Sequence, residues 1–149
     1  MNIYTQPQQS HSWNGTTYRI LLSSAETQGA MSIVHGVAGP LEGPPSHVHE
    51  AEDETFLVLE GVIDFELEGT VFRRGPMETA HIPRGKRHSF RTGPDGAVCI
   101  AVLTPGGFEG FFKEVAAGGF QIPRDIAAVA ECAARYGSQF TGPGLAQRG

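Results

Sequence analysis

The chemically richest stretch of the sequence is residues 46–61, which read SHVHEAEDETFLVLEG. His47 and His49 are separated by one residue, so in an extended strand their rings point to one side, roughly 6.5–7 Å apart along the chain. Glu54 follows a short acidic turn, at the start of the next apolar run. Two imidazoles and a carboxylate arranged in this way can converge on one metal cation.

A fourth ligand for such a cation could come from the segment PRGKRH at residues 83–88. Pro83 and Gly85 favour a tight turn, and His88 would open the strand that follows it. Three imidazoles and one carboxylate form a mixed nitrogen and oxygen set, which suits iron, nickel, manganese, copper, cobalt or zinc. We therefore expect one divalent transition metal ion as cofactor, with up to two coordination positions open to small molecules.

The elements that would position these residues are short apolar runs separated by turns rich in glycine and proline. The runs are YRILLSS, MSIVHGVA, TFLVLEG, VIDFELEG, TVFRR, TAHIP, HSFRT and AVCIAVL. Within residues 62–67, Ile63, Phe65 and Leu67 alternate with polar positions, as in a strand with one buried face. Many short strands at regular spacing favour an all-β sandwich or barrel.

Both ends of the chain differ from this pattern. The first dozen or so residues are polar, and we expect them to form an arm. A first amphipathic helix is expected from the stripe Phe108, Phe111, Phe112 and Val115, and a second from the stripe Ile126, Val129, Ala130 and Ala133. The predicted organisation is one domain over residues 1–149, with an N-terminal arm at 1–15, a β-barrel at 16–104 and a helical C-terminal tail at 105–149.

Two motifs in this sequence resemble the signatures of the cupin superfamily. The first is His47, one residue, His49, four residues, Glu54, six residues, Gly61; the second is Gly75, then Pro83, one residue, Gly85, two residues, His88. Together with the flanking segments, they make the chain similar to the small single-domain cupins related to quercetin dioxygenase. The resemblance implies a double-stranded β-helix, or jelly-roll barrel, with short C-terminal helices. It also implies that His47, His49, Glu54 and His88 bind the metal inside the barrel.

The sequence departs from these signatures at two positions. The first signature usually begins with a glycine six residues before its first histidine, where this chain has Leu41 between Gly39 and Gly43. The second usually ends with an asparagine four residues after its histidine, where this chain has Thr92. We expect both positions to shape turns, so the departures bear on loop geometry and leave the ligand set intact.

Several neighbours of the predicted ligands are candidates for other roles. Glu50, Glu52 and Asp53 compete with Glu54 for the cation, but we expect them to form a solvated acidic loop. His81 lies two residues before Pro83 and could face the cavity and contact a ligand. Aromatic walls for a substrate are expected from Phe56, Phe65 and Phe90. A metal beside such a cavity suits an aromatic or enol-bearing ligand better than a sugar phosphate.

Three functions fit this constellation. The first is a metal-dependent dioxygenase or related oxidoreductase acting on a flavonol-like substrate, with Glu54 as the catalytic group that moves the substrate proton. The second is a non-catalytic module that binds a metal or a small molecule. The third is a metal-dependent lyase or isomerase, which needs a mobile acid or base; His81 and Glu52 are the nearest candidates.

Composition narrows the partners further. The formal net charge is −5 and basic residues are few, so the chain lacks the basic face that nucleic-acid binding requires. The opening residues MNIYTQPQQSHSW have neither a basic start nor an apolar core, and no apolar run approaches the length of a membrane span, so we expect a cytoplasmic protein. Because single-domain cupins commonly pair and exposed edge strands favour pairing, we expect a homodimer.

Overall fold

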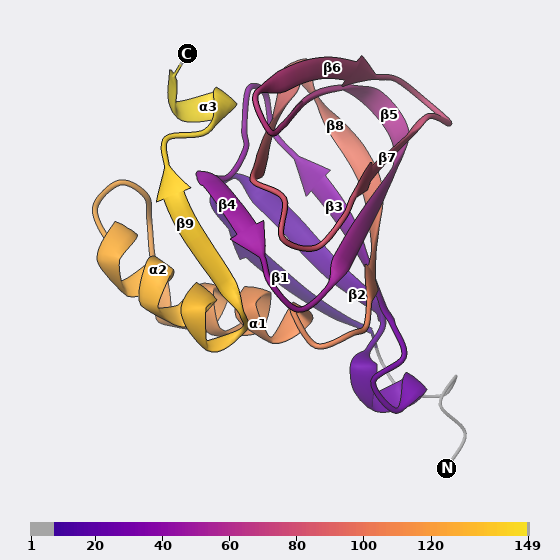
Figure 1. Cartoon of the computed structure of the whole chain (residues 1–149), viewed down its shortest axis with the longest axis vertical. Helices are drawn as coiled ribbons and strands as arrows, with labels where there is room; N and C mark the ends of the chain where they lie inside the picture. The colour runs from indigo at the N-terminus through magenta and orange to yellow at the C-terminus, as the bar shows by residue number, and fades with distance from the viewer. Residues whose placement is uncertain (1–7, 149) are drawn as a thin grey trace.

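The computed structural model describes residues 8–148 as one curled β-sheet with helices near its C-terminal end (Figure 1). The strands are β1 (Gln9–Trp13), β2 (Thr16–Leu22), β3 (Ser32–Ala38), β4 (Ser46–His49), β5 (Asp53–Leu67), β6 (Thr70–Arg74), β7 (Thr79–Ile82), β8 (His88–Thr104) and β9 (Ser138–Gly142). The helices are η2 (Ser24–Thr27), α1 (Glu109–Gly118), α2 (Ile126–Arg135) and α3 (Leu145–Arg148). The predicted fold class, an all-β jelly-roll with short C-terminal helices, is confirmed.

The two long strands β5 and β8 hold the barrel together, because each takes part in both faces. Residues 53–61 of β5 pair with residues 97–104 of β8, next to β3 and β7. Residues 63–67 pair with residues 88–92, next to β6 and β4. Irregular pairing around Gly61 separates the two halves of the strands. Gly61 has φ +75°, and a Cβ at this position would lie only 2.3 Å from the carbonyl oxygen of Gly96. A glycine is therefore required at the bend.

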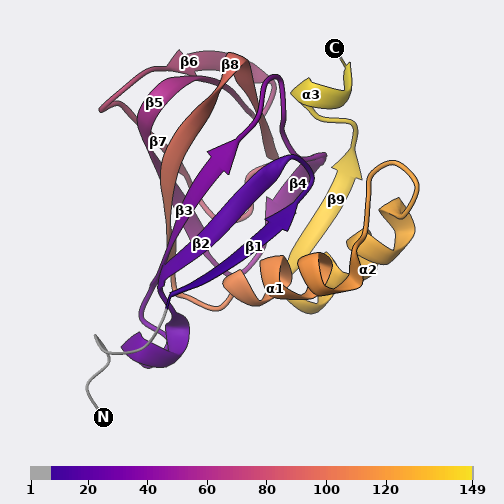
Figure 2. The same ribbon diagram turned by 180° about the vertical axis from the view of Figure 1, so that it is seen from behind.

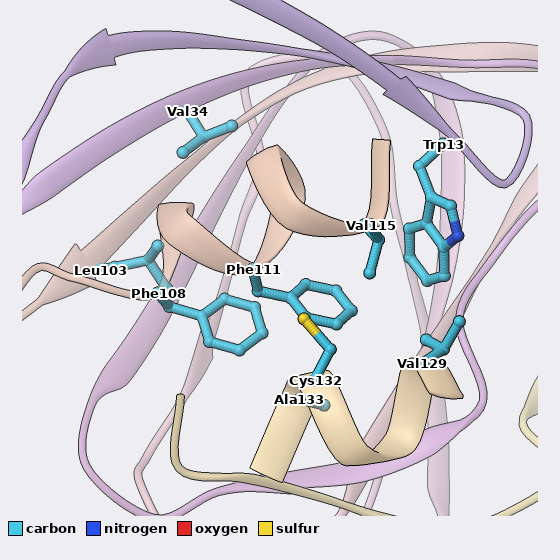
Figure 3. Close-up of a cluster of buried hydrophobic side chains, with 9 residues drawn as sticks. All are labelled: Trp13, Val34, Leu103, Phe108, Phe111, Val115, Val129, Cys132 and Ala133. Carbon is cyan, nitrogen blue, oxygen red and sulfur yellow. The ribbon is translucent and has the colours of Figure 1, made fainter. Parts of the chain in front are cut away.

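The open side of the curled sheet lies between its two end strands, β1 and β9. Helix α1 packs on β1, α2 packs on β9, and the two helices contact each other (Figures 1 and 2). We call α1, α2 and β9 the C-terminal wall. The wall buries one apolar core with the sheet, drawn in Figure 3: Trp13, Val34, Leu103, Phe108, Phe111, Val115, Val129, Cys132 and Ala133.

A second apolar core fills the other end of the barrel, below β6 and β7. Its buried members are Phe56, Val58, Ile63, Phe65, Ala80, Ile82 and Ala97. The alternation predicted for residues 62–67 explains part of it, since Ile63 and Phe65 are 1% and 0% exposed. The cavity described below lies between the two cores.

The predicted ends of the barrel need two corrections. Residues 9–13, expected in a loose arm, form strand β1, which pairs with β2 from Gln9 to Trp13; residues 1–7 of the expected arm lie outside the described part of the chain. The tail is not wholly helical, because β9 follows α2 and pairs with β4. β1 forms a hairpin with the next strand, β2, whereas β9 pairs with a strand far away in the sequence. Each places an apolar side chain inside, Trp13 or Phe140. Within residues 8–148, no helix has the length and apolar character needed to cross a membrane.

Candidate metal centre

Four buried side chains from three strands converge between the faces of the sheet. His47 and His49 come from β4, Glu54 from the start of β5 and His88 from the start of β8. His47 and His88 are direct partners across the β4–β8 pair. One ligand atom from each of the four lies within 4.8 Å of those from the others. All four residues are at most 7% exposed, so the cluster is shielded from solvent.

Two of the imidazoles are held in the tautomer that a metal requires. Nδ1 of His47 lies 2.8 Å from the Pro45 carbonyl, and Nδ1 of His88 lies 2.9 Å from the Lys86 carbonyl. A carbonyl can only accept a hydrogen bond, so each Nδ1 carries the hydrogen and each neutral ring keeps its Nε2 lone pair free. Backbone partners of this kind orient metal-binding histidines in proteins.

The third imidazole is oriented by Glu52, which the sequence analysis placed in a solvated loop. Glu52 is only 4% exposed, and its Oε1 lies 2.9 Å from Nδ1 of His49, while neither atom bonds any other described group. The expectation for Glu52 was wrong because the turn after β4 folds this carboxylate back under His49, three residues earlier. Glu50 is exposed as expected, and Asp53 pairs with Arg84 at the surface.

The inward atoms of the cluster are short of positive charge. Nε2 of His88 and Nε2 of His49 lie 3.3 Å and 3.6 Å from Oε1 of Glu54. Two imidazole lone pairs and a carboxylate at these separations repel one another unless a proton or a cation sits between them. A divalent ion with bonds of about 2.0–2.2 Å to nitrogen and oxygen fits the donor set, and no lysine or arginine lines the adjoining cavity.

The pKa values of the cluster show how the same charges are balanced by protons. Burial, with His88 and His49 beside it, holds the pKa of His47 well below its ordinary value. Burial also works against charge on His49, but the carboxylates of Glu54 and Glu52 outweigh it and raise the pKa of that ring. Burial alone would raise the pKa of Glu54, yet His49 and His88 lower it. A cation would take over the role of the proton on His49.

The cluster opens on an apolar cavity of about 70 Å³ that runs between the two cores. Among the predicted substrate contacts, Phe56 and Phe90 line it. Phe65 does not: it is fully buried behind Phe56, with ring centroids 5.1 Å apart. His81 does not either, because it is exposed on the outer face of β7, where its Nδ1 lies 2.8 Å from the Thr55 hydroxyl. The parity of the strand explains this, since its neighbour Ile82 takes the inward position opposite Glu54.

The C-terminal wall also contributes to this cavity, which its sequence does not predict. Phe108, Phe111 and Phe112, from the first turns of α1 and the residue before it, line the cavity. Phe140 of β9 also lines it and lies edge-on to His47, with ring centroids 6.3 Å apart. The helical spacing of the three phenylalanines was recognised, but nothing in their local pattern indicates which part of the barrel they face.

The two departures from the expected motifs meet each other beside the site. Leu41 has φ +56°, a left-handed backbone that glycine adopts without strain. Thr92 donates its hydroxyl to the Gly39 carbonyl at 2.6 Å and accepts from the Glu42 amide at 2.9 Å. Both positions therefore shape one loop, as expected, and Thr92 supplies the polar contacts that tie the loop to β8.

The part of the chain that matches a known protein family contains the metal-binding cluster. The family described as "Cupin domain" matches residues 36–103, which hold all four members of the cluster. Quercetin 2,3-dioxygenase from Bacillus subtilis (strain 168) is 30% identical over 96 residues, which are 64% of this chain and 28% of that protein. The chain spans less than a third of the length of the curated relatives it matches.

Two solved structures are also similar to this chain. The polyketide cyclase RemF from Streptomyces resistomycificus is 27% identical, with a TM-score of 0.57 over 70% of this chain and 78% of that one. A variant of Streptomyces PAC13 with uridine is 10% identical, with a TM-score of 0.67 over 99% of this chain and 98% of that one. The second likeness shows the fold alone, and it includes the C-terminal wall.

Proposed function

The chain belongs to the cupin superfamily, and from this premise we propose that it is a metal-dependent dioxygenase acting on a small aromatic or enol-bearing substrate of the flavonol type. One observation carries the proposal: the buried cluster of His47, His49, Glu54 and His88 opens directly on an aromatic-lined cavity. A charged donor set next to apolar walls suits a flat molecule with an oxygen at one edge. The identity to quercetin 2,3-dioxygenase supports the reaction class.

The residues of the cluster and of the cavity wall would have different roles in this reaction. A divalent ion bound by the cluster would lower the pKa of an enol or phenol whose oxygen it holds. Glu54 is the carboxylate of the cluster, and it would accept the hydroxyl proton of the substrate. Phe56 and Phe90 would hold the ring and keep water away from the activated carbon atoms, since both line the cavity.

The direct test is anaerobic incubation of the metal-loaded protein with a flavonol, followed by admission of air. We expect dioxygen uptake and loss of the flavonol absorbance with at least one of iron, nickel, manganese or cobalt. Single-ring hydroxypyranones carry the same enol-ketone group as a flavonol and belong in the same series. The absence of uptake with every ion and substrate would remove the dioxygenase proposal.

A cyclase or isomerase reaction at the same site is the second candidate, and the 27% identity to the polyketide cyclase RemF favours it. Such a reaction needs no dioxygen, so substrate loss under strict anaerobiosis would identify it. The acid and base candidates from the sequence support it poorly: His81 lies outside the cavity, and Glu52 is engaged with His49. A third outcome, tight binding of ion and ligand with no turnover, would indicate a binding module.

We also propose that the protein is a homodimer. Val71 on β6 and Met77 after it are 54% and 75% exposed, beside strands that pair only with β5 in the described part of the chain. Exposed apolar side chains next to a free strand edge favour pairing with another chain. Light scattering that returns the mass of one 15.9 kDa chain would contradict the proposal.

A further inference from the structure

The cavity contains polar groups that the metal centre does not use. The hydroxyl and thiol groups in its lining belong to Thr16, Tyr18, Thr92, Cys99 and Ser138. Thr92 is occupied by its two loop hydrogen bonds, and Ser138 lies at the metal end, directly opposite His49 on the neighbouring strand. The remaining three gather at the other end of the cavity.

Strand register places the backbone of this second polar group beyond the cluster along the sheet. Tyr18, Gly36, Cys99 and Val58 form one row across β2, β3, β8 and β5. Val58 is four residues beyond Glu54 on β5, so the backbone of the row lies about 13 Å farther along the strand. The Tyr18 hydroxyl and the Cys99 thiol still lie close enough to Glu54 for its charge to raise the pKa of each group. Gly36 carries no side chain, and a Cβ there would meet the Cys99 sulfur at 3.6 Å. The glycine therefore keeps space open between Tyr18 and Cys99.

Tyr18 has the best donor at this end. Its ring stacks on Phe112 of the C-terminal wall, with centroids 4.0 Å apart and an interplanar angle of 18°. Burial raises the pKa of Tyr18, so the hydroxyl stays protonated and can donate. Burial and the nearby Glu54 raise the pKa of Cys99 to about 12, so it stays a thiol, which is a weak donor.

We infer that Tyr18 forms a second recognition point for the substrate, which therefore carries two oxygen functions: an enol or phenol for the metal end and a distal hydroxyl or carbonyl for the Tyr18 end. This inference rests on the proposed function, because it assumes that the first oxygen binds at the cluster. A hydroxyl donor in a largely apolar pocket discriminates well between ligands that do and do not match it. Tyr18 is thus a specificity-determining residue rather than a metal ligand.

The experiment compares two single-ring hydroxypyranones that share the enol-ketone head and differ in one distal hydroxyl, kojic acid and allomaltol. Their affinities for the zinc-loaded protein are measured by calorimetry for the wild type, Tyr18→Phe and Tyr136→Phe. Tyr136 is the matched control, since its hydroxyl bonds Glu114 at 2.6 Å and it does not line the cavity. Unfolding curves establish that both variants fold.

We expect the wild type and Tyr136→Phe to bind kojic acid at least fivefold more tightly than allomaltol, and Tyr18→Phe to bind the two within twofold. An equal preference in Tyr18→Phe, or none in the wild type, overturns the inference. Failure of the wild type to bind either compound overturns it together with the enol part of the proposed function. The expected preference without dioxygen uptake removes the dioxygenase proposal and leaves the recognition point standing.

Discussion

In the metal centre, three of the four converging side chains come from the eight residues His47 to Glu54. The C-terminal wall of the same cavity instead packs against β1, which comes from the other end of the chain. The centre is held by short polar contacts to nearby carbonyls and to Glu52. The wall is held by apolar packing between α1, α2 and β1. The two regions face one cavity, yet they should respond to different perturbations.

The largest effect should come from breaking the donor set with His49→Ala or His88→Ala. Loss of one of four ligands should weaken binding of nickel or zinc by at least 100-fold, because the remaining donors no longer surround the ion. Metal content after dialysis and the rise in melting temperature on adding the ion measure the effect. His81→Ala, at an exposed histidine outside the cavity, is the control and should bind metal like the wild type.

The same variants should also lower the unfolding free energy of the metal-free protein, because each removes a buried ring. The loss should be larger for His49→Ala, where the ring touches the wall, since His49 lies edge-on to Phe108 with ring centroids 4.4 Å apart. A ligand variant that retained full metal affinity would contradict the assignment of that residue.

The next effect should come from breaking the wall with Phe111→Ala. Phe111 is 3% exposed and packs edge-on against Trp13, with ring centroids 5.4 Å apart. Truncating a buried phenylalanine costs about 3–5 kcal/mol, which denaturant unfolding would measure. Ile126→Ala, at a position 39% exposed on α2, should cost far less. A loss below about 1 kcal/mol for Phe111→Ala would mean that the wall is not part of the cooperative core.

The same contrast explains what could be predicted from the sequence. Side-chain parity in strands relates spacing to direction over a few residues, so His47, His49 and Glu54 could be grouped without a structure. His88 was only a possible fourth ligand on that basis, and the resemblance to the cupin signatures joined it to the other three. The strand β9 could not be predicted, because its pairing with β4 spans about ninety residues and its pattern of five residues is weak. Tyr18 was missed for the same reason, since its strand faces the cavity only after the sheet has curled.

Two positions within the motifs show a second limit of prediction from the sequence. Leu41 and Thr92 replace residues that the motifs usually have, and each was expected to affect only a turn. In the structure they meet, because the Thr92 hydroxyl on β8 bonds Gly39 and Glu42 of the loop that holds Leu41. Each departure is visible in the sequence, but the contact between the two positions is not. Residues about fifty positions apart leave no local pattern that would indicate such a contact.

A smaller effect is expected from Glu52→Gln, which leaves all four ligands in place. The amide keeps the shape of the side chain but removes the charge beside Nδ1 of His49, so the ring becomes a poorer donor. Loss of such a supporting contact typically weakens metal binding 10–100-fold, which a competition assay with a chelating dye can measure. Glu50→Gln, at an exposed neighbour, should have no effect; equal affinities for the two variants would show that Glu52 does not support the site.

The smallest effect concerns a charged cluster on the outer side of the wall, where solvent screens each interaction. Glu114 of α1 accepts hydrogen bonds from Tyr136 at 2.6 Å and Arg135 at 2.5 Å, and from the thiol of Cys132 at 3.2 Å. These donors lower the pKa of Glu114 from 4.5 to about 2. Because the folded-state value is the lower one, the stabilisation is complete above about pH 4.5 and disappears as the pH falls through about 2.

The matched variant is Glu114→Gln, compared with Glu60→Gln at an exposed position of β5. Glu114→Gln should lower the melting temperature slightly at pH 6, and the difference from the wild type should narrow steadily between pH 4.5 and pH 2. Glu60→Gln should show no such narrowing. If the melting-temperature difference between Glu114→Gln and the wild type stayed constant between pH 4.5 and pH 2, the side chain of Glu114 would join the two helices by packing alone. The C-terminal wall, unlike the metal centre, would then owe none of its stability to charge.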